Sequence, residues 1–177
     1  MKVVGIDPGT GACGYAVVDE RQGRLTALAH GCWRTRSSTD LQDRLKRIYD
    51  AVVDLIAEHR PDAVALEESF VGVDARTALS VGQARGAVLV ACAAAAVPST
   101  EYPPNRVKQT VCGYGHADKA QVQRMVQRLL GLPRAPTPHH AADALAVAIC
   151  HALAPPLLVR AVAGRARPPS PSAEARA

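Results

Sequence analysis

The chain has 177 residues, of which 48% are hydrophobic, and a formal net charge of +5. This length and apolar content fit one domain with a substantial core. The five cysteines are odd in number and form no C-x-x-C pair, which favours unpaired thiols in a reducing compartment over a disulfide framework or a zinc site. No export signal is visible, and the apolar run over residues 86–97 is too short to span a bilayer. We therefore expect a cytoplasmic protein in which that run forms a buried helix.

The positive charge is unevenly distributed along the chain. Residues 1–98 hold 11 basic and 12 acidic side chains, whereas residues 99–134 hold 6 and 2, and residues 155–177 hold 4 and 1. A polyanion-binding surface and a simple solvated face are both compatible with the basic segment.

The first strand ends on a carboxylate. The apolar residues before Asp7 predict a strand, and Pro8 with Gly9 turns the chain directly after it. Gly9, Gly11 and Gly14 match the dinucleotide-binding pattern G-x-G-x-x-G, but that site requires a helix where residues 15–19 are strand-like. We expect these glycines to leave room for a phosphate backbone beside Asp7 instead.

The remaining elements follow in order. Strands over residues 15–19 and 25–33 predict an antiparallel meander with the first strand. Further apolar patterns predict strands over residues 63–66 and 99–102, and helices over residues 41–60, 76–97, 106–111, 119–130 and 139–153. The fourth of these strands in chain order, residues 63–66, ends on Glu67 and Glu68. The alternation predicts an α/β fold with a mixed central sheet.

The last predicted helix carries Asp143 among almost entirely apolar neighbours. A buried carboxylate is costly unless a cation or strong donors compensate its charge. His140 and His139 precede it by three and four residues, so either can share its helix face. A site formed by Asp7, Glu67, His140 and Asp143 would hold one or two Mg²⁺ or Mn²⁺ ions. The alternative is that Asp143 only hydrogen-bonds nearby backbone.

Six motifs in register resemble the RuvC family of bacterial Holliday junction resolvases, from about residue 2 to residue 151. They are G-I-D-P-G-T-G-x-x-G-Y at 5–15, A-L-E at 65–67, G-Q-A-R-G at 82–86, V-K-Q-T-V-x-G at 107–113, D-K-A-Q-V at 118–122 and A-A-D-A-L-A-x-A at 141–148. Any one of these motifs alone would be weak, but the set is specific.

The resemblance implies a ribonuclease H-like nuclease domain over residues 1–154. The five prolines and the small and basic side chains of residues 155–177 predict a disordered Pro/Arg-rich tail after it. The resemblance further implies a homodimer that resolves four-way DNA junctions by paired symmetric nicks in recombination and repair. The reaction would be divalent-metal-dependent phosphodiester hydrolysis, and the RuvA and RuvB branch-migration proteins would be partners.

The resemblance also assigns site residues. Asp7, Glu67, His140 and Asp143 match the catalytic metal ligands. Many relatives carry aspartate at the position of His140, so the histidine favours Mn²⁺, and His139 is its rival.

Five further residues match DNA-binding positions of the family. They are Phe70, Gln83, Arg85, Lys108 and Lys119. Two other functions are compatible with parts of the pattern. A non-catalytic junction-binding protein would use only the basic segment, and an actin-like or sugar-kinase-type ATP-binding domain would need a second lobe.

Overall fold

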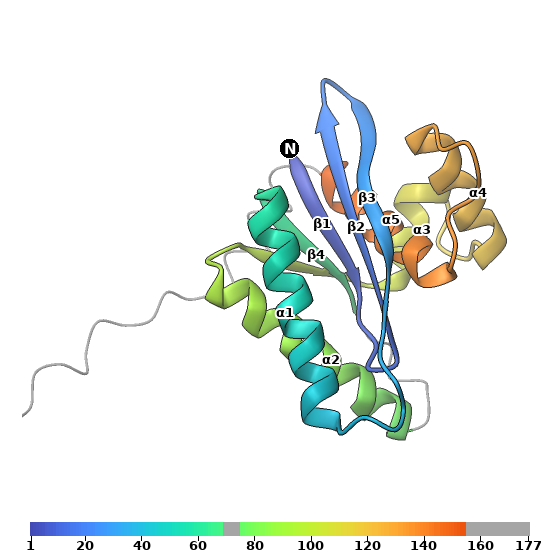
Figure 1. Cartoon of the computed structure of the whole chain (residues 1–177). Coiled ribbons are helices and arrows are strands. Elements are labelled where there is room, and N and C mark those ends of the chain that lie inside the picture. Colours follow the sequence, from blue (N-terminus) through green and yellow to red (C-terminus); the bar gives the residue numbers. More distant parts are fainter. Residues whose placement is uncertain (69–74, 155–177) are drawn as a thin grey trace, which may run out of the picture.

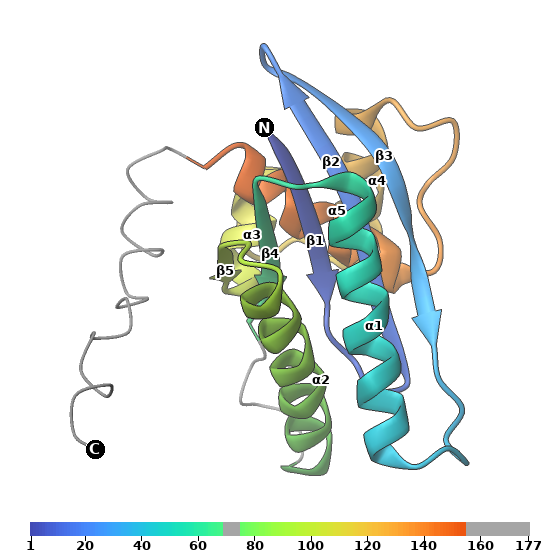
Figure 2. The ribbon, with the colours of Figure 1, turned by 60° about the vertical axis from the view of Figure 1, so that its left-hand side comes forward.

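Five strands form one mixed sheet in the order β3-β2-β1-β4-β5, and helices cover both of its faces (Figures 1 and 2). The structure is a computed structural model and describes residues 1–68 and 75–154. Its elements are β1 (Lys2–Asp7), β2 (Ala12–Arg21), β3 (Arg24–Arg34), α1 (Leu41–His59), β4 (Ala63–Glu67), α2 (Ala75–Ala94), β5 (Ser99–Tyr102), α3 (Pro104–Cys112), α4 (Lys119–Leu130) and α5 (His139–Ala152).

The strand pairing confirms the predicted meander and the mixed sheet. Strands β1, β2 and β3 are antiparallel neighbours, whereas β4 runs parallel to both β1 and β5. In the register, Ile6 pairs with Leu66, so β1 and β4 end side by side. Asp7 and Glu67 are the last residues of these strands and therefore lie at the same edge of the sheet.

The two faces of the sheet bury different helices. Val4 and Ile6 pack with residues of α1 and α2, while Val3 and Ala65 pack with residues of α3, α4 and α5. Since side chains alternate along a strand, Asp7 and Glu67 project on the same face as Val3 and Ala65. Both carboxylates therefore face α5, and Glu68 is exposed, as the alternation predicts.

Two glycines allow α5 to lie directly on the sheet. A Cβ atom at Gly5 would lie 2.0 Å from the carbonyl oxygen of Ala144, and one at Gly14 would lie 2.0 Å from that of His140. No side chain fits at either position. The expectation that Gly14 leaves room for DNA is therefore wrong, because the backbone of α5 occupies that space.

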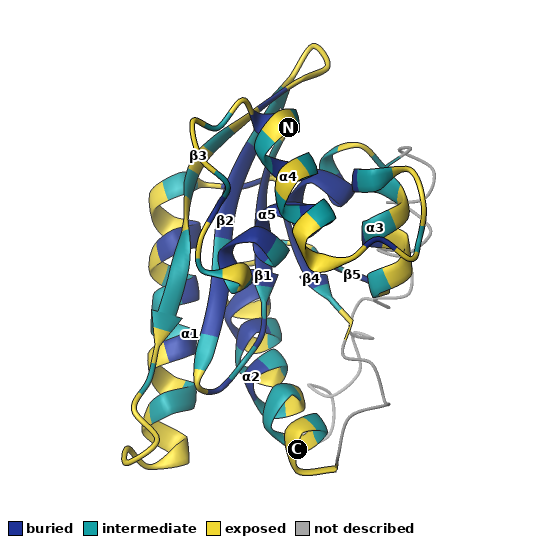
Figure 3. Cartoon of the chain, turned by 90° about the vertical axis from the view of Figure 1, so that its right-hand side faces the viewer, coloured by how far each residue is buried: buried dark blue, intermediate teal, exposed yellow. Residues whose placement is uncertain are grey.

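Helix α2 is only partly buried, which corrects the prediction of a buried helix. Val88 and Ala91 are buried against α1 and the sheet, but Leu79 is 65% exposed and Val90 is 60% exposed, and much of the helix is teal or yellow in Figure 3. Among residues 1–68 and 75–154, α2 alone is long and apolar enough to cross a membrane, with 22% of its most apolar stretch buried. In this structure α2 packs along α1 as part of the domain.

The predicted Pro/Arg-rich tail over residues 155–177 and the segment over residues 69–74 lie outside the described residues.

Candidate active site

A cavity of about 460 Å³ opens where the ends of β1 and β4 face α3, α4 and α5. All four predicted metal ligands line this cavity. They are Asp7, Glu67, His140 and Asp143. His139, Lys108 and Lys119 also line it, together with apolar side chains from α2, α3 and α4. Acidic, basic and imidazole groups from five elements thus line one cavity.

The closest polar contact in the cavity joins Asp7 and His140. The Nδ1 atom of His140 lies 2.6 Å from Oδ2 of Asp7. This hydrogen bond raises the pKa of His140 above its ordinary value, against the smaller opposing effect of burial. Because an ionised carboxylate can only accept, His140 donates from Nδ1, which leaves Nε2 available to a water molecule or an ion.

His139 also lines the cavity but differs from His140 in its surroundings. The two imidazole rings are adjacent, with centroids 4.1 Å apart. Burial and the neighbouring charge of His140 lower the pKa of His139, and no described carboxylate forms an ion pair with it. Both histidines line the cavity and remain candidate metal ligands, but only His140 is hydrogen-bonded to Asp7.

Two further carboxyl groups in the cavity are held in an unfavourable electrostatic environment. Burial raises the pKa of Glu67 to about 7, and the carboxylates of Asp143 and Asp7 add to the rise. Burial raises the pKa of Asp143 to about 6, and Asp7 again contributes. A bound cation would remove both penalties, and oxygen-rich donor sets suit hard divalent ions. The donor set therefore fits a divalent metal.

The ligands do not form a closed coordination shell as the side chains stand. Within residues 1–68 and 75–154, no three His, Cys, Asp or Glu side chains converge closely enough to surround an ion. Asp7 and His140 contact each other, whereas Glu67 and Asp143 interact with Asp7 through space. The cavity is thus an arrangement of donors that a cation would draw together.

The two predicted lysines come from α3 and α4 and line the same cavity. Lys108 comes from α3, and Lys119 is the first residue of α4. A capping box fixes the start of α4, because Asp118 accepts a hydrogen bond from the backbone of Gln121 at 2.8 Å and Gln121 accepts one from the backbone of Asp118 at 2.9 Å. Both lysines partly offset the raised pKa of Glu67.

Arg85 and Gln83, two other predicted DNA-binding residues, do not line the cavity. The guanidinium of Arg85 forms a two-point ion pair with Glu101 on β5, with Nη2 donating to Oε2 at 2.5 Å. Gln83 is half-buried on α2 and does not line the cavity. Phe70 lies outside the described residues. The Arg85–Glu101 pair was missed from the sequence, because nothing local connects residues 16 positions apart on different elements.

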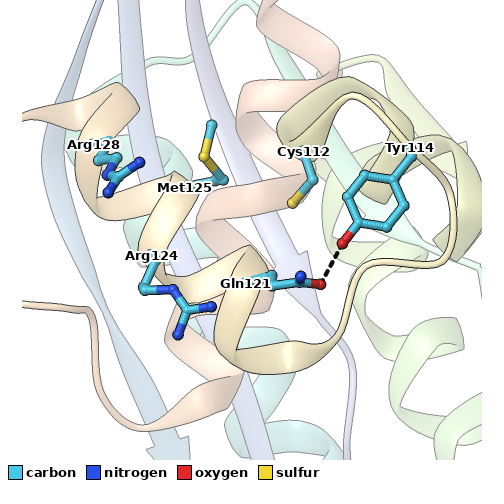
Figure 4. A pocket seen from close by; sticks show the side chains of 6 residues that line it. All are labelled: Cys112, Tyr114, Gln121, Arg124, Met125 and Arg128. Carbon is cyan, nitrogen blue, oxygen red and sulfur yellow. Dashed lines mark hydrogen bonds between the residues drawn. The ribbon is translucent and has the colours of Figure 1, made fainter.

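A separate hollow of about 230 Å³ lies on the outer side of α3 and α4. Figure 4 shows its side chains, with the hydroxyl of Tyr114 donating to Oε1 of Gln121 at 2.5 Å. Arg124 and Arg128 line it, but no carboxylate does. It therefore has no part in the candidate metal centre.

The model of the family described as crossover junction endodeoxyribonuclease RuvC matches residues 3–151. The chain belongs to the RuvC family. A RuvC from Desulfitobacterium hafniense is 48% identical over 160 residues, which cover 90% of this chain and 97% of that protein. A RuvC from Moorella thermoacetica is 49% identical over 167 residues, covering 93% of this chain and all of that protein (100%).

Solved RuvC structures share the fold. The Thermus thermophilus RuvC in complex with Holliday junction substrate superposes with a TM-score of 0.83 and is 42% identical over 86% of this chain and 93% of its own. A second Thermus thermophilus RuvC structure gives a TM-score of 0.80 at 41% identity, covering 93% of this chain and 97% of its own. These likenesses confirm the predicted ribonuclease H-like fold and the resemblance to RuvC. They also leave the ATP-binding alternative without support.

Proposed function

We propose that this chain resolves four-way (Holliday) DNA junctions by paired symmetric nicks, in recombination and DNA repair. RuvC nucleases are crossover junction endodeoxyribonucleases and depend on metal ions. The observation that carries the proposal for this chain is the single cavity that gathers three carboxylates, His140 and two lysines. A non-catalytic junction-binding protein would have no need for that set of donors.

Asp7, Glu67, His140 and Asp143 are the proposed metal ligands and catalytic residues. We propose Mg²⁺ or Mn²⁺, with one or two ions in each subunit, because carboxylate oxygens suit both ions and an imidazole suits Mn²⁺ better than Mg²⁺. When bound, such an ion supplies Lewis-acid stabilisation of the phosphate and a more acidic water. Glu67 and Asp143 would then be ionised at neutral pH, since the cation offsets the burial and the carboxylate repulsion that raise their pKa values.

Asp7 and the lysines have distinct proposed roles. Asp7 orients the imidazole of His140 through the 2.6 Å hydrogen bond and holds the proton on Nδ1. Lys108 and Lys119, which line the same cavity, would bind the phosphate that is cut and stabilise negative charge that develops on it. Phe70, Gln83 and Arg85 are proposed DNA contacts on the basis of the motifs alone.

A homodimer follows from two symmetric nicks, and α2 offers a suitable surface for it. Leu79, Gly82, Gly86 and Val90 recur at helical spacing along one face, and a Cβ atom at either glycine would meet nothing within 4 Å. Leu79 and Val90 are exposed on the same face. We propose that a second copy covers this face, that RuvA and RuvB are partners, and that the protein acts in the cytoplasm.

Incubation of the purified protein with a synthetic four-way junction in Mg²⁺ or Mn²⁺ tests the function. We expect nicks at symmetric positions, while a linear duplex of the same sequence stays uncut. Asp7→Asn should retain junction binding in a mobility-shift assay and lose cutting by at least about a thousandfold, since a metal ligand and the partner of His140 are both removed. Equal cutting of the linear duplex contradicts junction specificity, and binding without any cutting by the wild type favours the non-catalytic alternative.

A further inference from the structure

A strongly basic pocket lies next to the candidate active site, at the end of β3 and the start of α1. Its cavity has a volume of about 650 Å³. Seven residues line it: Arg34, Thr35, Arg36, Thr39, Asp43, Arg44 and Arg47. Figures 1 and 2 both show the end of β3, the first turn of α1 and the β1–β2 turn at the same end of the molecule. We refer to these seven residues as the arginine pocket.

The floor of the pocket is attached to the turn that follows Asp7. The Nε atom of Arg44 donates to the carbonyl oxygen of Thr10 at 3.2 Å and to Oγ1 of Thr35 at 3.1 Å. The backbone N–H of Thr35 donates to the carbonyl oxygen of Gly11 at 3.1 Å. Arg44 is therefore held in place, and these hydrogen bonds attach the pocket to the β1–β2 turn.

The other three arginines of the pocket are not neutralised. Arg34, Arg36 and Arg47 are exposed, and none of the four arginines forms an ion pair with a carboxylate of residues 1–68 or 75–154. Asp43 is the one acidic residue in the lining, so four positive charges face one negative charge. Like charges held together repel, and a bound polyanion would relieve that repulsion.

The chemistry of the lining is suited to phosphate. Guanidinium groups bind phosphate oxygens with two parallel hydrogen bonds, and threonine hydroxyls add further donors. The pocket is open to solvent and holds no large apolar side chain that could anchor a folded protein partner. A nucleic-acid backbone presents successive phosphates and fits this lining better than an acidic peptide.

The sheet register places the pocket beside the point of cleavage. Asp7 pairs with Gly14, and Gly14 pairs with Cys32, two residues before Arg34. Arg34 lies two strands away from Asp7 across the sheet and two residues further along β3. With the usual spacing between strands and between residues, the backbone of Arg34 is roughly 12 Å from that of Asp7. At about 3.4 Å per base step, this corresponds to roughly three or four steps along a duplex.

We propose that the arginine pocket binds phosphates of the junction arm that flanks the cut strand, about three or four nucleotides from the scissile phosphate. This inference rests on the proposed nuclease function and adds a second anchoring point to it. Two anchors on one arm fix the direction in which the strand crosses Asp7. Arg36 and Arg47 contact the DNA, while Arg44 holds the pocket to the turn.

A charge-matched pair of double variants tests the proposal. Arg36→Ala with Arg47→Ala removes two exposed cations from the pocket. Arg21→Ala with Arg24→Ala removes two exposed cations from the far end of the same β2–β3 hairpin and serves as the control. Junction affinity is measured between about 50 and 200 mM salt, where each lost phosphate contact should reduce the slope of log K against log salt by about 0.9. Cutting is measured separately, with enzyme in excess over the junction.

The pocket variant should bind the junction at least about tenfold more weakly, with a slope shallower by about 1.8, while the control keeps the wild-type slope. At saturating enzyme the control variant should cut at the wild-type rate, because Arg21 and Arg24 lie at the far end of the β2–β3 hairpin. Neutral methylphosphonate linkages three or four nucleotides from the cut should weaken wild-type binding and leave the pocket variant unaffected.

Three outcomes would overturn the proposal while the wild type still cuts junctions. They are an unchanged salt slope in the pocket variant, an equal loss in the control, and methylphosphonate effects that are the same in both proteins. An unchanged salt slope of junction binding would favour an acidic protein segment as the ligand of the arginine pocket. Failure of the wild type to cut any junction would instead contradict the proposed function.

Discussion

Asp7 and His140 are 133 positions apart in the chain, yet Nδ1 of His140 lies 2.6 Å from Oδ2 of Asp7. The contact exists because α5 rests on the sheet at Gly14, which is the β2 partner of Asp7 and touches the backbone of His140. The hydrogen bond therefore depends on the close approach of helix and sheet. It ties the first strand to the last helix at the centre of the candidate active site.

The first prediction separates the two adjacent histidines. His140→Ala should lower junction cutting at least about a hundredfold, because it removes a proposed metal ligand that is hydrogen-bonded to Asp7. His139→Ala should stay within about tenfold of wild type, since His139 has no carboxylate partner among the described residues. Single-turnover cutting measures both variants, under conditions in which each binds the junction as well as wild type does. His140→Asp, which places a carboxylate at this position, should retain cutting in Mg²⁺. Loss of cutting only in His139→Ala would reverse the assignment.

The second prediction concerns metal and pH. Without a cation, the pKa of Glu67 is raised to about 7 and that of Asp143 to about 6, so both carboxyl groups are partly protonated near neutrality. A metal must displace these protons, and its apparent affinity should therefore rise as the pH increases from about 5.5 to about 8.

Calorimetric titration of Mn²⁺ in buffers of different ionisation enthalpy measures the protons released. We expect proton release on binding at about pH 6.5 and little at about pH 8.5. Glu67→Gln removes the group with the higher pKa and should reduce the release at about pH 6.5. Release that is independent of pH would contradict the proposed ligand set.

The third prediction tests the close packing of α5 on the sheet. A methyl group at Gly5 would overlap the carbonyl oxygen of Ala144. Gly5→Ala should therefore lower the free energy of unfolding by at least about 2 kcal/mol, because the helix must shift. Gly11→Ala, whose new Cβ would be 3.9 Å from Arg44, should change it by less than about 0.5 kcal/mol. Urea unfolding of the three proteins decides, and equal stability of Gly5→Ala and wild type would refute the packing argument.

The fourth prediction concerns the open face of α2. Val90→Glu places a charge on the proposed dimer surface and should convert the protein to monomers at micromolar concentration. Leu28→Glu is the matched control, because Leu28 is also exposed but lies on β3. Sedimentation velocity measures both. An unchanged dimer in Val90→Glu, or dissociation in both variants, would show that α2 is not the contact.

Several features of the site could be predicted because they follow from local patterns. Asp7 and Glu67 each end a short apolar run, and adjacent parallel strands bring such ends to one edge. Asp143 is conspicuous as a carboxylate in an apolar helix. Motif spacing then favours His140 over His139, and the structure joins His140 to Asp7.

Other features could not be predicted because they depend on long-range packing. The arginine pocket stayed hidden because residues 1–98 contain 11 basic and 12 acidic side chains, and a sum over sequence does not show which of them meet in space. The pairing of Arg85 with Glu101 depends on the position of α2 beside β5. The partial exposure of α2 was missed because an apolar helix can face either a core or a partner.

The sequence by itself determined the order of strands and helices and singled out the candidate acidic ligands, since periodicity and chain turns are local properties. Tertiary structure alone decided which groups share an environment. It set the raised pKa values of Glu67 and Asp143, the hydrogen bond between Asp7 and His140 and the cluster of arginines beside them. These depend on burial and on distances between remote residues, which are established only when α5 packs on the sheet.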